Sequence, residues 1–225
     1  MQETSAFEDR KFDEWFAPFS TAFGHKGRQR WAPVYLRGLI YPGERKSIEP
    51  LAGRVAPGEY DQLHHFVAVS EWECAPLEKV LLDKADEMLG GEDAHLIIDD
   101  TALPKKGTHS VGVAHQYCGQ LGKQANCQAL VSVTLAREEI PVPVALRLYM
   151  PESWCSDPTR RKKAKVPEEV IYRPKWKIAL ELLDRANSNG VKFRWLTFDE
   201  GYGGEPGFLA GLRERRQMKI GRSFS

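Results

Sequence analysis

Two acidic positions each follow a short apolar run of strand length. Asp99 and Asp100 come directly after the run 94–98, AHLII, and Asp199 comes directly after the run 192–198, KFRWLTF. Carboxylates that are held close together repel each other unless one is protonated or a cation bridges them. Mg²⁺ suits such a site, since it takes carboxylate oxygens together with water and substrate phosphate. The pattern is therefore compatible with metal-dependent phosphoryl transfer, in which two ions about 3.5–4 Å apart activate the attacking oxygen and stabilise the leaving one.

A structural role for the same aspartates is the alternative. Asp100 would then cap a turn and Asp199 would begin the loop Gly201–Gly203, where aspartate is common. The spacing of the residues leaves both interpretations open. If the strand continues through Asp99 and Asp100, their side chains point to opposite faces. We therefore expect at most one of the two to face a metal.

Two strands and the helix between them must bring these acids together. Residues 174–188 carry an apolar stripe at helical spacing and precede the second of the two runs. A strand, a crossover helix and a second strand place the runs 94–98 and 192–198 parallel, so that their C-terminal ends share one edge of the sheet. Asp100 and Asp199 would then approach each other.

Further strands and a helix complete the predicted sheet domain. Residues 129–135, ALVSVTL, are rich in β-branched residues, and residues 140–148, IPVPVALRL, follow a plausible turn. Pro141 and Pro143 cannot donate to a strand ladder, so we expect 140–148 to lie at an edge. A last helix is expected at 204–216. The predicted order is βββαβα, which is an α+β or α/β arrangement around a mixed sheet.

The part of the chain before this sheet is expected to be helical. Aromatic residues recur there at three- and four-residue steps, as on one face of a helix; they are Phe12, Trp15, Phe16, Phe19 and Phe23. Residues 33–41, 46–55 and 77–88 give three more predicted helices, separated by Pro-Gly breaks and ended by Gly-Gly. We therefore predict two domains, a helical region 1–91 and a sheet region 92–225.

Composition and charge narrow the class of protein. The 225 residues are 42% hydrophobic and 28% charged, which is ordinary for a globular protein. The sequence has no run of about 18 apolar residues, and its N-terminus is acidic and polar, so we expect no membrane helix, no signal peptide and a cytoplasmic location. Residues 1–100 carry a net charge of −8 and residues 101–225 carry +9. Within the acidic half, the basic segment 26–54 is either a phosphate-binding surface or a solvated surface that balances nearby acids.

The four cysteines, Cys74, Cys118, Cys127 and Cys155, are expected to be free thiols in a cytoplasmic chain. A zinc site is a weaker alternative. It would use Cys118 and Cys127 with two nearby histidines, His109 and His115, but the spacing matches no common zinc template.

Several long blocks of the chain resemble DDE transposases of bacterial insertion sequences. The blocks occur in the family's order, and they are RQRWAPVYLRGLI with RKSIEPLAGRV, then IIDDTALPKKGTHSVGVAHQYCGQLGKQANCQ, PESWCSDPTRRKKA and LTFDEGYGGEPGFLAGLRER. The resemblance covers about residues 8–216. It implies an RNase H-like core behind an N-terminal helical region, and DNA cleavage and strand transfer that depend on Mg²⁺ or Mn²⁺. It also implies that Asp100 is the first catalytic, metal-binding acid and Asp199 the second; Asp100 is preferred over Asp99 because it directly precedes Thr101.

The same resemblance implies that the region 1–91 binds DNA and that the region 92–225 is catalytic. It makes DNA the partner and suggests which basic residues contact it. Three groups are expected to meet phosphates, with a solvated surface as the alternative for each. They are Arg28, Arg30, Arg37 and Lys46; Lys105 and Lys106, near His109; and Arg160, Arg161, Lys162 and Lys163. A homodimer is one assembly that the resemblance allows.

The third acid of the family, a glutamate on a later helix, has no match here. Glu200, Glu205 and Glu214 come too early, and the residues after Arg216 are too few for another strand and helix. We therefore expect a core that is truncated at its C-terminus, with an exposed sheet edge or apolar face there and poor solubility. The alternative function is a catalytically dead fragment that binds DNA or regulates transposition.

Overall fold

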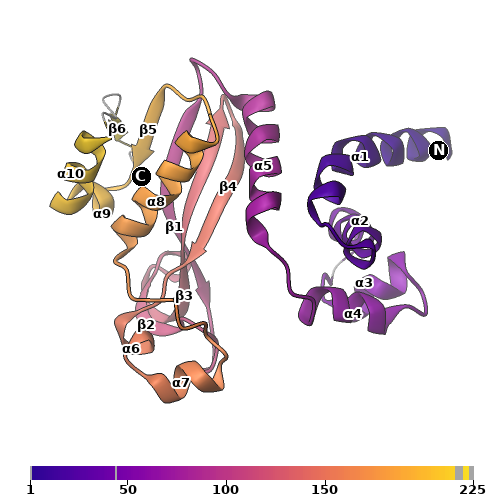
Figure 1. Cartoon of the computed structure of the whole chain (residues 1–225), viewed down its shortest axis with the longest axis horizontal. Coiled ribbons are helices and arrows are strands. Elements are labelled where there is room, and N and C mark those ends of the chain that lie inside the picture. Colours follow the sequence, from indigo (N-terminus) through magenta and orange to yellow (C-terminus); the bar gives the residue numbers. More distant parts are fainter. Residues whose placement is uncertain (1, 44, 216–219, 223–225) are drawn as a thin grey trace. The chain divides into compact units, whose positions relative to one another are not determined.

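In the computed structural model of the chain, helices make up the first part of the sequence and a mixed β-sheet with helices makes up the rest (Figure 1). The structure describes the backbone of residues 2–43, 45–215 and 220–222, and the side chains of residues 10–43 and 45–215. The chain forms two compact units, Met1–Leu81 and Leu82–Ser225, each with its own core. The expected mixture of helices and a mixed sheet is thus confirmed. Whether the functional domains divide at residue 91 stays a prediction.

The first unit is built from aromatic-rich helices. Its helices are α1 (Gln2–Ala22), α2 (Lys26–Ile40), α3 (Ile48–Val55) and α4 (Tyr60–Ala68). Phe16, Leu51 and Leu63 are buried in one cluster, and Phe66 stacks near Trp72 with ring centroids 4.6 Å apart. The predicted stripe on α1 therefore serves mainly as core. No helix of the described residues is long and apolar enough to cross a membrane.

The second unit contains a six-stranded sheet. Its strands are β1 (His95–Pro104), β2 (Ala114–Cys118), β3 (Lys123–Arg137), β4 (Ile140–Leu148), β5 (Trp195–Phe198) and β6 (Ile220–Arg222). The strand order is β2-β3-β1-β5-β6, and β4 pairs with a different stretch of β3 than β2 does. β1 runs antiparallel to β3 and parallel to β5, so the sheet is mixed. Among the described strands β4 pairs with β3 alone, which confirms the edge position expected from its prolines.

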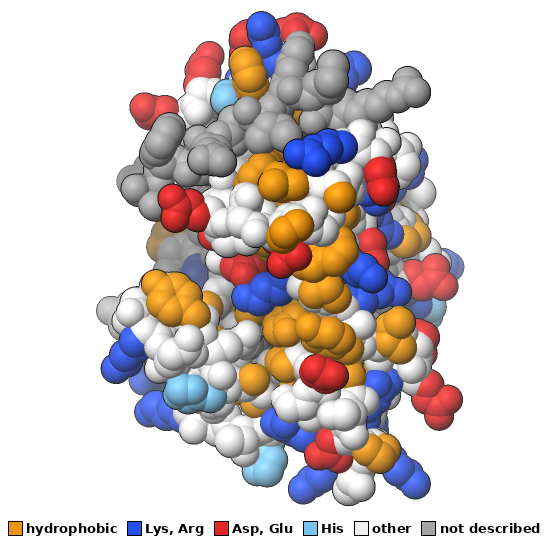
Figure 2. All heavy atoms as spheres, turned by 90° about the vertical axis from the view of Figure 1, so that its left-hand side faces the viewer, with side chains coloured by type: hydrophobic (Ala, Val, Ile, Leu, Met, Phe, Trp, Pro, Cys, Tyr) orange, Lys and Arg blue, Asp and Glu red, His pale blue; other side chains and the backbone are white. Residues whose placement is uncertain are grey.

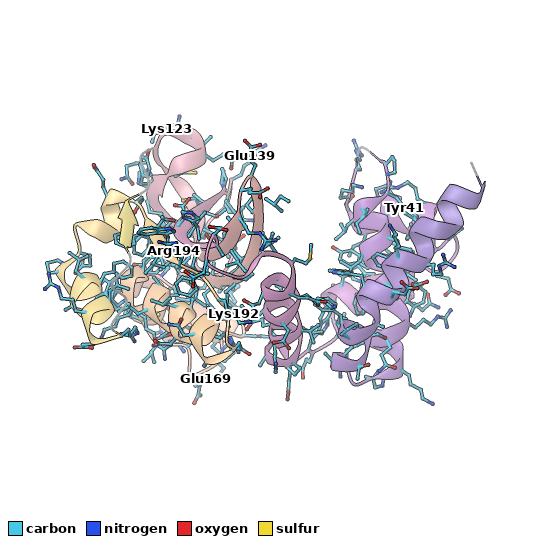
Figure 3. All side chains as sticks on the ribbon, turned by 90° about the horizontal axis from the view of Figure 1, so that it is seen from above. Tyr41, Lys123, Glu139, Glu169, Lys192 and Arg194 are labelled. Carbon is cyan, nitrogen blue, oxygen red and sulfur yellow. The ribbon has the colours of Figure 1, made fainter. Side chains whose placement is uncertain are left out.

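Helices cover the sheet and connect its strands. The division between the units falls inside α5 (Cys74–Leu89), whose Leu82, Ala85 and Leu89 join the core of the second unit. The others are α6 (Glu152–Cys155), α7 (Pro158–Lys163), α8 (Lys175–Ser188), α9 (Glu200–Gly203) and α10 (Pro206–Glu214). Side chains of α5 and α8 fill the space beside the sheet, with Lys192 next to α5 (Figure 3).

The crossover through α8 explains how β1 and β5 become neighbours. Pro174 precedes the helix, and Gly190 follows it with a φ of +78° that suits glycine at a helix end. The helix buries the predicted stripe, which includes Ala179, Leu182 and Leu183, against the sheet core. The returning chain therefore pairs β5 parallel to β1, with Ile98 opposite Phe198. The parallel, adjacent arrangement expected from the sequence is confirmed.

The predicted βββαβα order lacked two strands and three short helices, α6, α7 and α9. It missed β2. The glycine-rich loop before β2 and the polar start of β3 after it leave no clear alternation of apolar and polar residues, which is what indicates a strand. It also treated the last residues as too short for a strand, whereas the backbone of β6 pairs parallel with β5. The three backbone pairs cover most of β5, which is itself only four residues long. Residues 216–219 and 223–225 lie outside the described part of the chain.

Candidate active site at the ends of two parallel strands

The two predicted acids line one cavity where β5 ends beside β1. Pairing of β1 with β5 ends at Ile98 and Phe198. β5 stops there, whereas β1 continues through Asp100 to Pro104, paired with β3, so Asp100 and Asp199 both lie just past one edge of the stretch that pairs β1 with β5. Asp100 and Asp199 line a cavity of about 370 Å³ at this edge, together with Lys175 and Tyr202. Residues that lie 99 positions apart in the sequence thus face a common space.

Both carboxylate oxygens of Asp100 have a donor. Lys175 Nζ, at the start of α8, lies 2.5 Å from Oδ2, and the Tyr202 hydroxyl donates to Oδ1 at 2.6 Å. About a third of each side chain in the ion pair is exposed, 29% for Asp100 and 32% for Lys175, so solvent screens the pair in part. Lys175 Nζ also lies 5.5 Å from the centre of the Tyr149 ring. The Asp100 carboxylate is therefore held from two sides.

Tyr202 reaches both acids. Asp199 begins α9, and its Oδ1 accepts the backbone N–H of Tyr202 at 3.1 Å. The Tyr202 side chain is only 5% exposed, and its ring packs 5.3 Å from that of Phe208 on α10. Burial, followed by the negative charge of Asp100, raises the pKa of the Tyr202 phenol. The phenol consequently stays protonated and keeps its role as a donor at neutral pH.

Asp99 occupies a different position from Asp100. Its side chain is exposed, does not line the cavity, and accepts the backbone N–H of Asp100 on Oδ1 at 2.7 Å. Its carbonyl accepts from the Ser132 hydroxyl at 2.9 Å. Partial desolvation raises the pKa of Asp99, against the lowering effect of the Asp100 amide, and the charge of Asp199 raises it further. The two aspartates point apart, as expected for neighbours in a strand.

The proposed zinc residues are not gathered into a site. No group of three or more His, Cys, Asp or Glu side chains suited to a metal occurs among the described residues. Cys118 and Cys127 are fully buried between β2 and β3, while His109 and His115 line a separate cavity of about 600 Å³. The four cysteines are free thiols, as expected.

The helix α7 and the loop between β1 and β2 are joined by a hydrogen bond and carry six basic residues, Lys105, Lys106 and Arg160 to Lys163. We call these two segments the basic platform. Arg160 donates to the carbonyl of Thr108 at 2.6 Å and stacks on Trp154, with its guanidinium carbon 3.7 Å from the ring centre. Asn126 holds the same loop by donating to the carbonyls of Lys105 and Gly107. Figure 2 shows histidine, lysine and arginine side chains gathered at the lower end of this face, where Figure 1 places β2, α6 and α7.

The four basic residues of α7 differ in what they contact. Arg160 is fixed as described, and Arg161 donates to the carbonyls of Pro167 and Glu168 at 2.8 and 3.2 Å. Lys162 and Lys163 are exposed, and Lys163 lines the cavity that contains His109. The arginines therefore hold the platform together while the lysines present charge to solvent.

In the first unit, two of the four predicted DNA contacts serve the structure of the unit itself. Arg37 lies 2.5 Å from Asp13, and Lys46 donates to the carbonyl of Tyr41 at the end of α2. Arg30 forms a longer ion pair of 3.8 Å with Glu59. Arg28 lines a cavity of about 740 Å³ on this unit.

Lys175 and Tyr202 are site residues that the sequence did not reveal. Each contacts Asp100 across a large separation in sequence, 75 residues for Lys175 and 102 for Tyr202. One signal was present for Tyr202, because it lies in the segment DEGYG directly after the second acid. Lys175 had no comparable signal, since a lysine at the start of a helix is common on solvent-exposed surfaces.

Comparison with known proteins gives two matches. A family model described as DDE superfamily endonuclease matches residues 18–223. The chain is also 31% identical, over 166 residues, to a probable transposase for insertion sequence element IS701 from Microchaete diplosiphon. That match covers 74% of this chain and 41% of the relative. The chain thus spans about two fifths of the length of this curated relative.

Proposed function

Since the chain belongs to the DDE superfamily endonucleases, among transposases of insertion sequences, we propose that it cleaves DNA strands and transfers them in transposition. The observation that carries the proposal is the common cavity of Asp100 and Asp199, just past the stretch in which β1 and β5 pair in parallel. In this proposal Asp100 is the first catalytic acid and Asp199 the second. DNA is the substrate and the partner; a homodimer and a cytoplasmic location stay predictions.

The arrangement of strands supports an RNase H-like core. β3 runs antiparallel to β1, β4 runs antiparallel to β3, and β5 and β6 follow β1 on the other side in parallel. These antiparallel strands with parallel strands beside them support the RNase H-like core that the family resemblance implies. Asp100, within β1, and Asp199, directly after β5, then lie near the centre of the sheet, where these two strands are neighbours.

The donor set at this edge fits a divalent cation with oxygen ligands. Asp100 and Asp199 offer carboxylate oxygens to the same cavity, and carboxylate oxygens are ligands that Mg²⁺ takes. These two residues would hold Mg²⁺ or Mn²⁺. The bound cation would polarise the reacting phosphate and activate the attacking oxygen.

The residues around the acids prepare the site for this role. Tyr202 orients Asp100 through its hydroxyl, and the charge of Lys175 offsets the repulsion between the carboxylates. The basic platform on α7 and the loop between β1 and β2 would bind the DNA backbone. Lys105, Lys106, Lys162 and Lys163 would meet phosphates there, with Arg160 and Arg161 holding the platform. On the first unit, Arg28 and Arg30 would supply a further surface, beside Arg37 and Lys46, which hold the unit together.

A nicking assay tests this proposal. The substrate is supercoiled plasmid that carries the DNA flanking the gene, and the assay contains the 225-residue chain with Mg²⁺, Mn²⁺ or EDTA. We expect cation-dependent nicking that Asp100→Asn and Asp199→Asn both reduce to background. Asp99→Asn is the matched control, because its carboxylate lies outside the cavity; this variant should retain the activity.

Each other outcome overturns part of the proposal. Nicking that survives in both Asp100→Asn and Asp199→Asn would exclude these acids as the catalytic pair. An equal loss of nicking in Asp99→Asn would mean that the activity does not depend on whether Asp99 or Asp100 lines the cavity. DNA binding without nicking under any cation would assign the chain a binding role alone.

A further inference from the structure

Tyr202 is the one residue seen, within the described part of the chain, to make a hydrogen bond to each of the two acids. Its hydroxyl donates to Asp100 Oδ1 at 2.6 Å, and its backbone N–H donates to Asp199 Oδ1 at 3.1 Å. The first contact comes from the side chain and the second from the main chain. Tyr202 therefore links the two carboxylates directly, through one hydrogen bond to each.

We propose that Tyr202 is the positioning residue that sets the separation of Asp100 and Asp199 for a shared divalent cation. This inference rests on the proposed metal-dependent function of the site. It assigns no chemical step to the phenol. It assigns to Tyr202 the task of holding two ligands, from different strands, in the geometry that a cation requires.

The surroundings of Tyr202 make it rigid enough for this task. The side chain is 5% exposed, and its ring lies between the site and Phe208, whose own ring packs edge-on against Phe198 at 5.1 Å. Phe198 is the last residue of β5, directly before Asp199. Tyr202 is thus fixed to the same strand end that carries the second acid, while its hydroxyl reaches the first.

A purely structural role would explain only half of these contacts. The bond from the Tyr202 amide to Asp199 is an ordinary cap at the start of α9. The cap does not require a hydroxyl on the ring, and phenylalanine would fill the same buried space. The hydroxyl is explained by the Asp100 carboxylate, which it meets on the side opposite Lys175.

The loss of a partner that orients a metal-binding carboxylate typically weakens metal affinity by about 10–100-fold. Tyr202→Phe removes only the hydroxyl and keeps the ring packing. The test is titration of the 225-residue chain with Mn²⁺ alone, in which free Mn²⁺ is followed by electron paramagnetic resonance. We expect the Mn²⁺ dissociation constant to rise by about 10–100-fold in Tyr202→Phe, with an unchanged urea midpoint and unchanged DNA affinity in EDTA.

Tyr172→Phe is the matched control. Tyr172 lines the same cavity, but none of its described contacts reaches Asp100. It should leave the Mn²⁺ affinity unchanged. A drop in affinity of the same size in Tyr172→Phe would show a general effect of cavity polarity and would overturn the assignment to Tyr202.

Gly201→Ala changes the spacing without touching the phenol. A Cβ on Gly201 would lie 3.2 Å from Asp199 Oδ1, which is closer than nearly all such contacts, so Asp199 must shift. We expect weaker Mn²⁺ binding here too, and this variant keeps the test decisive if Tyr202→Phe does not fold.

The outcomes separate this inference from the proposed function. If the wild-type chain binds Mn²⁺ and both Tyr202→Phe and Gly201→Ala bind it equally well, the positioning role is wrong and the metal site stands. If the wild-type chain binds no Mn²⁺, while its urea midpoint shows a folded protein, the metal-dependent function is wrong and the inference falls with it.

Discussion

At the scale of single residues, the site is organised by charge around Asp100. Lys175 supplies a positive charge 2.5 Å from one carboxylate oxygen, in the space where a cation would approach. A nearby cation favours the ionised carboxylate but disfavours a second cation. Lys175 therefore holds the Asp100 carboxylate in place, and it competes with a divalent cation for the same oxygen.

Replacing Lys175 by methionine tests this competition. Ion pairs between partly exposed groups contribute about 0.2–1 kcal/mol, so we expect Lys175→Met to tighten Mn²⁺ binding by about 1.4- to 5-fold. The direction is opposite to that expected for Tyr202→Phe. The measurement is the Mn²⁺ dissociation constant, and Lys177→Met is the control because Lys177 lies on the same helix over Trp176 and not at Asp100. Weaker binding in Lys175→Met would contradict competition.

The contacts at this scale could be predicted from the sequence only in part. The two acids were found because each ends an apolar run, and their shared cavity follows from parallel strands. Lys175 and Tyr202 reach Asp100 only once the helix α8, the strand β5 and the helix α9 have been placed. Neither contact is encoded by a local pattern, so no spacing argument could have found them.

At the scale of elements, the long pattern-bearing segments were predictable and the short or polar ones were not. α8 has a complete apolar stripe, and the central part of β3 is rich in β-branched residues. The first residues of β3, KQANCQ, are polar yet pair with β2, because the pairing depends on backbone groups rather than on burial. β6 has three residues, too few for any period to appear.

The short helix α7 carries a prediction about DNA binding. Each lysine that neutralises a phosphate contributes about 0.9 to the slope of log affinity against log salt concentration. We expect Lys162→Gln and Lys163→Gln each to lower that slope by about this amount. Lys192→Gln is the control, since Lys192 is 76% exposed but lies beside α5 and pairs with Asp86 (Figure 3). Fluorescence anisotropy at several salt concentrations gives the slope; equal slopes in all four proteins would exclude α7 as a phosphate-binding element.

At the scale of the whole molecule, the chain has two hydrophobic cores in two units. Leu63 lies in the core of Met1–Leu81, and Leu183 lies in the core of Leu82–Ser225; both are fully buried. The division falls inside α5, where the sequence shows one uninterrupted helix. A boundary between compact units that falls within a helix leaves no Pro, Gly or composition signal, so the sequence could not predict it.

Cavity-forming substitutions test whether the two cores are independent. Leu63→Ala and Leu183→Ala should each cost about 2–5 kcal/mol of unfolding free energy. Hydrogen exchange followed by mass spectrometry should show faster exchange within residues 1–81 for Leu63→Ala and within 82–225 for Leu183→Ala. Faster exchange across both units in either variant would instead mean that the chain unfolds as one cooperative body.

The central claim is that the carboxylates of Asp100, within β1, and Asp199, directly after β5, bind one divalent cation between them. The most direct measurement is the anomalous difference density of Mn²⁺ in crystals of the 225-residue chain. We predict a peak bound by oxygens of both Asp100 and Asp199, at about the 2.0–2.1 Å typical of Mg²⁺ ligands. Density at Asp99, or none within reach of Asp100 while Lys175 and Tyr202 still hold its carboxylate, would contradict the claim.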